Sequence, residues 1–172
     1  RAGLMRTLLA AAVALAAAPA LAAPPVASYV FPAGGQRGTT VPVRVGGLFL
    51  HERCGFALAG PGVTAPPTLT RTPRIWFEGP VIPLPDSQQA EDYPADMAGT
   101  VTLAADAPVG PRKGYLFTSQ GAGGGLVFVV GDLPEVVERE ADGEAIPARV
   151  TLPVTANGRV LPRDDLDLWE FT

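Results

Sequence analysis

The sequence predicts an all-β protein made of antiparallel sheets packed face to face. Short runs rich in Val, Leu and Phe recur along the chain and are separated by turn residues, which is the usual pattern of strands in a sandwich. The 20 Gly and 19 Pro of the 172 residues are scattered rather than periodic. No amphipathic helix pattern of useful length follows residue 22.

Each strand is expected where an apolar or alternating run lies between turn signals. The expected strands are residues 26–31, 39–45, 56–60, 74–79, 99–105, 114–119 and 126–131. We expect the glycine-rich segment QGAGGG to connect the last two strands as a hairpin. Pro42 indicates an edge strand, because proline cannot donate to a ladder. Together these runs predict an immunoglobulin-like β-sandwich over residues 23–131.

Residues 5–22 have the features of a secretory signal peptide. A positive start at Met5-Arg6 precedes an apolar run, and small residues end it at Ala20-Leu21-Ala22. The alternative, a membrane anchor, needs about 20 apolar residues, and this run is shorter. We therefore expect cleavage near Ala22 and a secreted chain, extracellular or periplasmic, with no membrane association afterwards.

The charge is unevenly distributed. Residues 23–131 hold seven acids and seven bases, whereas residues 132–172 hold ten acids and four bases. This acidic excess argues against nucleic acid as a partner, because phosphates would be repelled. It also predicts a boundary near Gly131.

Residues 132–172 are expected to form an acidic linker and the start of a second β domain. Two apolar runs surround Asn157-Gly158, a favourable hairpin turn. The segment holds at most three or four strands, too few for an independent core. We therefore expect a truncated second domain and a chain that is part of a longer protein.

Two resemblances refine this interpretation. The segments FPAGGQRGTTVPVRVGG and DAPVGPRKGYLFTSQG…LVFVVGD resemble the first and last strands of an IPT/TIG-type module of secreted bacterial proteins. Residues 133–171 resemble the opening of the bacterial pre-peptidase C-terminal domain. The matching positions are Glu138, Glu140, Leu152, Pro153, Asn157, Gly158, Arg159, Asp165, Asp167, Trp169 and Phe171. This second resemblance implies a jelly-roll-like sandwich in which Trp169 and Phe171 enter the core.

Calcium is the cation that the acidic residues favour. Residues two apart on an extended segment share a face, and clustered carboxylates repel unless a cation neutralises them. Ca²⁺ takes six to eight oxygen ligands in flexible geometry. The candidate ligands are Glu138, Glu140, Asp142, Asp165 and Asp167. The resemblance implies the same two loops, but Gly143 stands where the family has a last acid. The alternative is a solvated acidic linker.

Catalytic chemistry has little support. His51 and Cys54 are each the only residue of their type, so HERC cannot complete a zinc site or a nucleophile–base pair. GAGGG lacks the Lys and Ser or Thr of a phosphate loop. We therefore expect a non-catalytic extracellular binding or spacer module whose partner is a polymer or a protein.

Two alternatives remain open. One is an accessory region of a secreted hydrolase whose catalytic domain lies beyond residue 172. The other is a carbohydrate-binding face, which requires exposed aromatic side chains. The candidates for that face are Trp76, Phe77, Tyr93 and Tyr115.

Overall fold

The computed structural model describes residues 23–75, 95–138, 140–141, 144–145, 148–158 and 168–172. Over these residues the chain forms strands and turns without a helix, which confirms the all-β prediction. The strands are β1 (Val26–Phe31), β2 (Gly34–Gln36), β3 (Thr40–Leu48), β4 (Arg53–Ala59), β5 (Val63–Thr64), β6 (Thr68–Ile75), β7 (Ala95–Leu103), β8 (Gly110–Thr118), β9 (Gly121–Gly131), β10 (Glu135–Val137), β11 (Glu140–Ala141), β12 (Glu144–Ala145), β13 (Ala148–Val150), β14 (Thr155–Asn157) and β15 (Trp169–Phe171).

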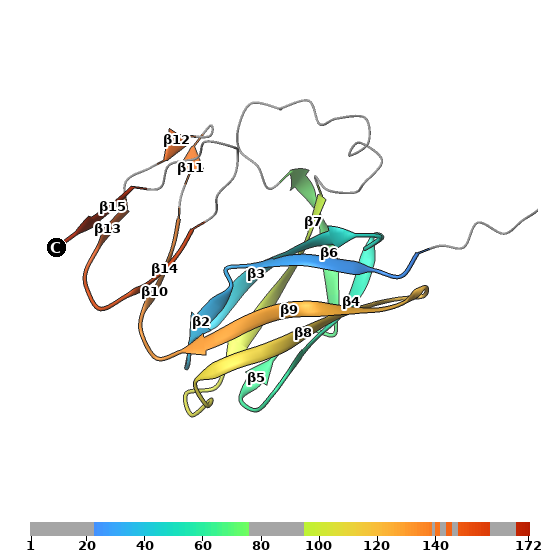
Figure 1. Ribbon diagram of the computed structural model, residues 1–172, viewed down its shortest axis with the longest axis horizontal. Coiled ribbons are helices and arrows are strands. Elements are labelled where there is room, and N and C mark those ends of the chain that lie inside the picture. The colour runs from blue at the N-terminus through green and yellow to red at the C-terminus, as the bar shows by residue number, and fades with distance from the viewer. Residues whose placement is uncertain (1–22, 76–94, 139, 142–143, 146–147, 159–167) are drawn as a thin grey trace, which may run out of the picture.

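Strands β1 to β9 form one sheet that curls until it is nearly closed. Its order is β1-β3-β7-β6-β4-β8-β9-β2, and β5 pairs with β7 (Figure 1). β1 pairs with β3 in antiparallel orientation. Two residues separate β1 from β2, which pairs with β9 in parallel orientation. The order β1-β3-β7-β6 followed by β4-β8-β9 corresponds to the ABED and CFG sheets of an immunoglobulin sandwich. The expected sandwich is therefore the fold observed.

Alternating residues of these strands fill the core. In β8 every second residue from Arg112 to Leu116 is buried, and in β9 the buried positions are Leu126, Phe128 and Val130. Met97, Leu69 and Leu116 meet them from the other strands. Full burial of such a side chain contributes about 1.5–3 kcal/mol. The hydrophobic core, rather than a disulfide, therefore holds the sandwich together.

Pro42 does not mark an edge strand as predicted. β3 lies between β1 and β7 and pairs with both. Its pairing with β1 begins only at Arg44, where β1 ends at Phe31, so Pro42 lies beyond that ladder. A missing N–H costs least where no strand is paired on one side.

The glycine-rich segment is a strand rather than a connection. β8 and β9 pair as far as Thr118 and Gly121, so Ser119 and Gln120 form the turn. The following glycines lie in β9. A Cβ on Gly123 would lie 2.1 Å from the carbonyl oxygen of Pro25, so glycine here lets the start of the chain pack closely against β9.

Arg112 is buried at one end of the sandwich. Its guanidinium donates to the carbonyl oxygens of Pro61, Pro108, Gly110 and Pro111, two of which belong to the DAPVG segment before β8. A buried cation needs such hydrogen bonds to offset its lost hydration. Arg112 therefore serves the fold and adds no charge to the surface.

The acidic C-terminal part forms three short two-stranded ladders. β10 pairs in parallel with β14, β13 pairs in parallel with β15, and β11 pairs with β12 as an antiparallel hairpin. The predicted turn at Asn157 is wrong, because Asn157 is the last residue of β14 and pairs with Val137. Phe171 was expected in a core but is 64% exposed in the described chain.

Candidate functional site

The structure describes only two of the five candidate calcium ligands. Glu138 follows β10, and its backbone N–H donates to the carbonyl oxygen of Asn157 over 2.9 Å. Glu140 begins β11. Asp142, Asp165 and Asp167 lie outside the described residues.

The acidic segment is not one extended run. Glu140 is paired with Ala145 and Ala141 with Glu144 in an antiparallel ladder, so the chain runs in opposite directions in β11 and β12. No group of three His, Cys, Asp or Glu side chains gathers within the described part of the chain. The calcium site therefore stays a prediction, and a single row of carboxylates on one strand does not provide it.

His51 and Cys54 do not form a site. Cys54 is buried in the core, where its Sγ donates to the carbonyl oxygen of Phe117 over 3.4 Å. Burial raises the pKa of the Cys54 thiol, and the hydrogen bond to Phe117 offsets part of that rise. His51 lies in the exposed β3–β4 connection. The buried, protonated thiol is a poor nucleophile and a poor metal ligand.

A buried polar cluster joins the C-terminal ladder to the sandwich. The Asn157 side chain is 9% exposed. Its Oδ1 accepts from the Ala33 N–H over 3.2 Å, and its Nδ2 donates to Glu135 Oε2 over 2.7 Å. Burial raises the pKa of the Glu135 carboxyl, and the bond from Asn157 opposes that rise. The cluster attaches β10 and β14 to the segment that links β1 and β2.

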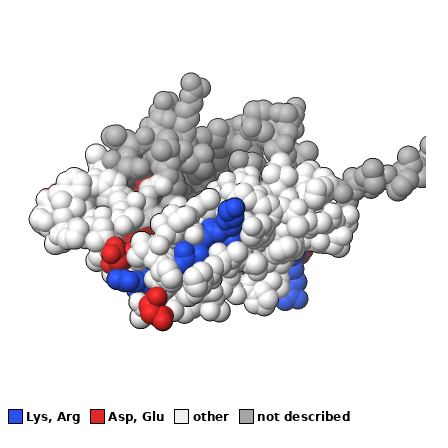
Figure 2. Space-filling view, turned by 60° about the horizontal axis from the view of Figure 1, so that its bottom comes forward, with Lys and Arg blue, Asp and Glu red and all other residues white. Residues whose placement is uncertain are grey.

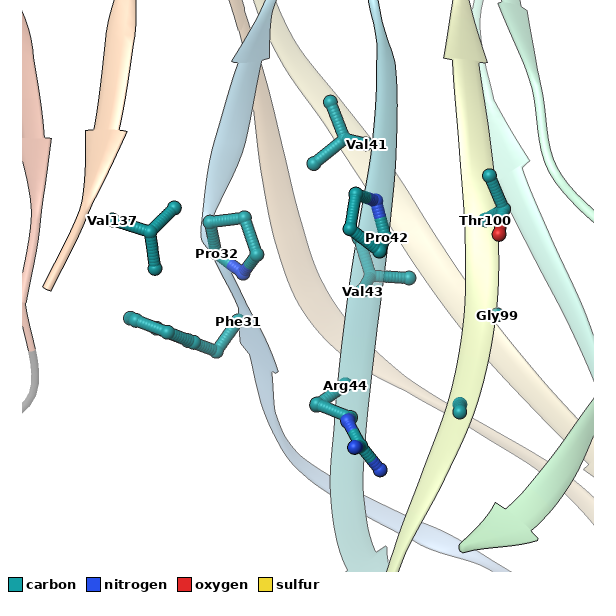
Figure 3. Close-up of a pocket in the computed structure, with 10 residues that line it drawn as sticks. Phe31, Pro32, Val41, Pro42, Val43, Arg44, Gly99, Thr100 and Val137 are labelled. Carbon is teal, nitrogen blue, oxygen red and sulfur yellow. The ribbon is translucent and has the colours of Figure 1, made fainter. Parts of the chain in front are cut away.

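A shallow groove of about 660 Å³ opens beside this junction (Figure 3). It lies near the end of β1, just before the chain continues into β2. Phe31 and Pro32 line one side, and Val137 of β10 lies beyond them. Its walls are mainly apolar. The guanidinium of Arg44 lies along it, and Arg44 Nη1 is buried with no hydrogen-bond partner among the described residues. The groove has the chemistry to hold a small apolar group next to a cation.

A group of exposed apolar side chains lies on β8 and β9. Tyr115 and Phe117 project from β8, and Val127 and Val129 project from β9. We call these four side chains the aromatic face. Tyr115 is 37% exposed and Phe117 is 43% exposed. Figure 2 turns the bottom of Figure 1 toward the reader. Most of this surface is uncharged, with Lys and Arg side chains near its middle and Asp and Glu side chains toward one end.

Small residues flank both rings. Phe117 is paired with Gly55 on β4 and Ala122 on β9, and Tyr115 is paired with Ala57 and Gly124. A Cβ on Gly124 would lie 3.3 Å from Cδ1 of Tyr115, so one edge of this ring lies beside the glycine. Because its neighbours on both strands are small, the aromatic pair stays partly exposed to solvent.

The sequence reasoning identified Tyr115 but missed Phe117. The signal was present, because residues two apart share a face of a strand and GYLFT places both rings at the same parity. The other aromatic candidates, Trp76, Phe77 and Tyr93, lie outside the described residues.

Comparisons with known proteins do not assign this chain to a family. A scan against protein-family models finds no match, and a search of the curated proteins finds none either. Within the described residues no helix is long and apolar enough to cross a membrane. The fold and the aromatic face therefore define the chain only as a β-sandwich protein with an exposed apolar sheet face.

Proposed function

We propose that this chain is a non-catalytic binding module of a larger secreted or cell-surface bacterial protein, which holds an extracellular polymer or protein at the aromatic face. The observation that carries the proposal is that the end of β8 and the second half of β9 are apolar on both sides. Leu116, Phe128 and Val130 fill the core, while Phe117, Val127 and Val129 point outward.

A sheet with one side in water normally alternates apolar inward and polar outward residues. Strands that are apolar on both sides are expected where both sides are covered. Within the described chain the inner side is covered by the core and the outer side remains exposed. A contiguous apolar patch on a monomer typically marks an interaction site. A partner is therefore the natural cover for the outer side.

The sheet beneath the face suits a binding role. β8 pairs with β9 along its whole length and with β4 along half of it. Rigid strands hold side chains in place before a partner arrives, which reduces the entropy lost on binding. The signal peptide and the calcium ligands belong to the same proposal and are supported by the sequence alone.

Co-sedimentation of the purified full chain with a panel of immobilised extracellular polymers tests this function. We expect retention by at least one polymer, and loss of that retention in the Tyr115→Ser/Phe117→Ser double variant. Exposed aromatic contacts of this kind contribute about 1–3 kcal/mol each. Retention that is unchanged in the double variant, or release of new chain ends from a polymer, would contradict the proposal.

A further inference from the structure

We infer that the occupant of the aromatic face is an acidic polysaccharide. Its sugar rings stack on Tyr115 and Phe117, and its carboxylates pair with Arg53 and Lys113. This inference rests on the proposed binding function and adds the chemical class of the ligand. It is argued from the order of the side chains on the face, the exposure of the rings and the charge.

A row across β4 and β8 is formed, in order, by Arg53, Phe117, Tyr115 and Lys113. Gly55 is paired with Phe117, Ala57 with Tyr115 and Ala59 with Lys113. Arg53 is two residues before Gly55, so it lies one step beyond Phe117 on the same face. The row therefore has a cation at each end and two rings in the middle. It extends for about 20 Å, at about 3.3 Å per residue.

Both rings are partly covered by the sheet and partly open. A Cβ on Gly124 would lie 3.3 Å from Cδ1 of Tyr115, and a Cβ on Gly55 would lie 3.1 Å from Cβ of Phe117. Tyr115 is 37% exposed and Phe117 is 43% exposed, so each ring keeps surface available to a ligand. The face of an aromatic ring carries negative charge density, which attracts the polarised C–H groups of a sugar ring.

The charge of the face selects an anionic partner. The sequences of β4, β8 and β9 contain no Asp or Glu, and Arg112 points inward to the carbonyl oxygens described above. Arg53 and Lys113 thus make this side positive in a chain whose net charge is −4. A local patch of opposite sign steers and orients a charged partner.

The same features disfavour other partners. The side chains that anchor protein interfaces typically insert into a pocket of the partner, whereas more than half of the surface of Tyr115 and of Phe117 is already covered. Nucleic acid has stackable bases, but two cations and an acidic remainder oppose a polyphosphate. A chain of sugar rings with spaced carboxylates matches two partly exposed aromatic rings between two cations.

Affinity electrophoresis of the full chain tests the inference with polygalacturonate and with the same polymer after methyl esterification, which removes the charge and keeps the sugar. We expect retardation by the acidic form and about 10-fold weaker binding in Tyr115→Ala or Phe117→Ala. Lys113→Gln and Arg53→Gln should each weaken binding about 2–5-fold and reduce its dependence on NaCl. Phe171→Ala, an exposed aromatic residue on β15, is the matched control and should bind as the parent does.

The outcomes separate the inference from the proposed function. Equal binding to the esterified polymer, preferential binding to single-stranded DNA, or no effect of Lys113→Gln overturns the acidic polysaccharide. If the aromatic variants fold, as judged by a cooperative melt, and bind as tightly as the parent, the aromatic face is not the binding site and the proposed function fails as well.

Discussion

At the scale of single residues, Asn157 shows how position changes the role of a side chain. Next to Gly158 it favours a turn, yet in the structure it is a buried strand residue that bonds Ala33 and Glu135. The side-chain amide can donate and accept at once, so it satisfies a backbone N–H and a carboxylate together. This residue joins the C-terminal ladder to the sandwich.

Replacement of Asn157 by Ala should destabilise that junction. The Ala33 N–H and the Glu135 carboxylate would lose their partner while partly buried, at a cost of about 1–3 kcal/mol. Chemical denaturation monitored by tryptophan fluorescence measures the loss. Thr155→Ala on the same strand, where the side chain is exposed, should change the free energy of unfolding by less than about 0.5 kcal/mol.

The pH dependence of stability provides a second measure of the same cluster. Because burial raises the pKa of Glu135, the folded chain binds this proton more tightly than the unfolded chain. The resulting contribution to stability is present below the unfolded pKa and is lost as pH rises through the folded pKa. Glu135→Gln should therefore raise the melting temperature at pH 7, and the difference should vanish near pH 4. A lower melting temperature at pH 7 would show that the ionised carboxylate is stabilising here.

At the scale of elements, β9 combines two requirements in one strand. Its second half is apolar on both sides, and its first half is rich in glycine because Pro24 and Pro25 pack against it. Composition alone favours a loop for the glycine half. The ladder with β8 makes it a strand, since pairing continues as far as Gly121.

Gly123→Ala should destabilise the sandwich by about 1–3 kcal/mol, because the added Cβ would overlap the backbone of Pro25 and overpacking costs this much. The control is Gly131→Ala in the same strand, where the nearest atom to the new Cβ would be 3.5 Å away and the backbone needs no positive φ. Thermal melts of the two variants make the comparison. Equal melting temperatures would mean that the contact with Pro25 does not form.

At the scale of the whole molecule, the calcium hypothesis has a direct test. If Ca²⁺ binds the folded chain through the acidic C-terminal residues, it should raise the melting temperature by mass action, with about 2.7 kcal/mol gained at 100 times the dissociation constant. Differential scanning calorimetry with Ca²⁺ and with a chelator measures this. Melts that coincide under both conditions would support the solvated linker instead.

Much of the fold could be predicted from local pattern. Six of the seven expected strands overlap strands of the described chain, because alternation of Val, Leu and Phe reports which side of a strand is buried. The seventh, residues 74–79, lies mostly outside the described residues. Their ends were less predictable. β8 begins at Gly110 and β7 at Ala95, both earlier than their apolar runs, because pairing with a neighbouring strand extends a ladder over residues of any polarity.

The candidate site was less predictable than the fold. Tyr115 was identified as an aromatic candidate, but its exposure depends on which side of β8 faces the core, and that is decided by the partner strands. Gly55 lies on β4, which is distant in sequence from Phe117 on β8, whereas Gly124 lies on β9, the other strand of the same hairpin. No local pattern places Gly55 beside Phe117.

By itself, the sequence determined that this protein is all β, that residues 23–131 contain the strands of a sandwich, and that its excess acid follows Gly131, since alternation, turn residues and charge are local properties. Only the tertiary structure decided that β1 pairs with β3 while β2 pairs with β9, that Asn157 is buried, and that the aromatic face assembles. These depend on pairing between distant strands, whose hydrogen bonds and contacts exist only when the sheet has closed.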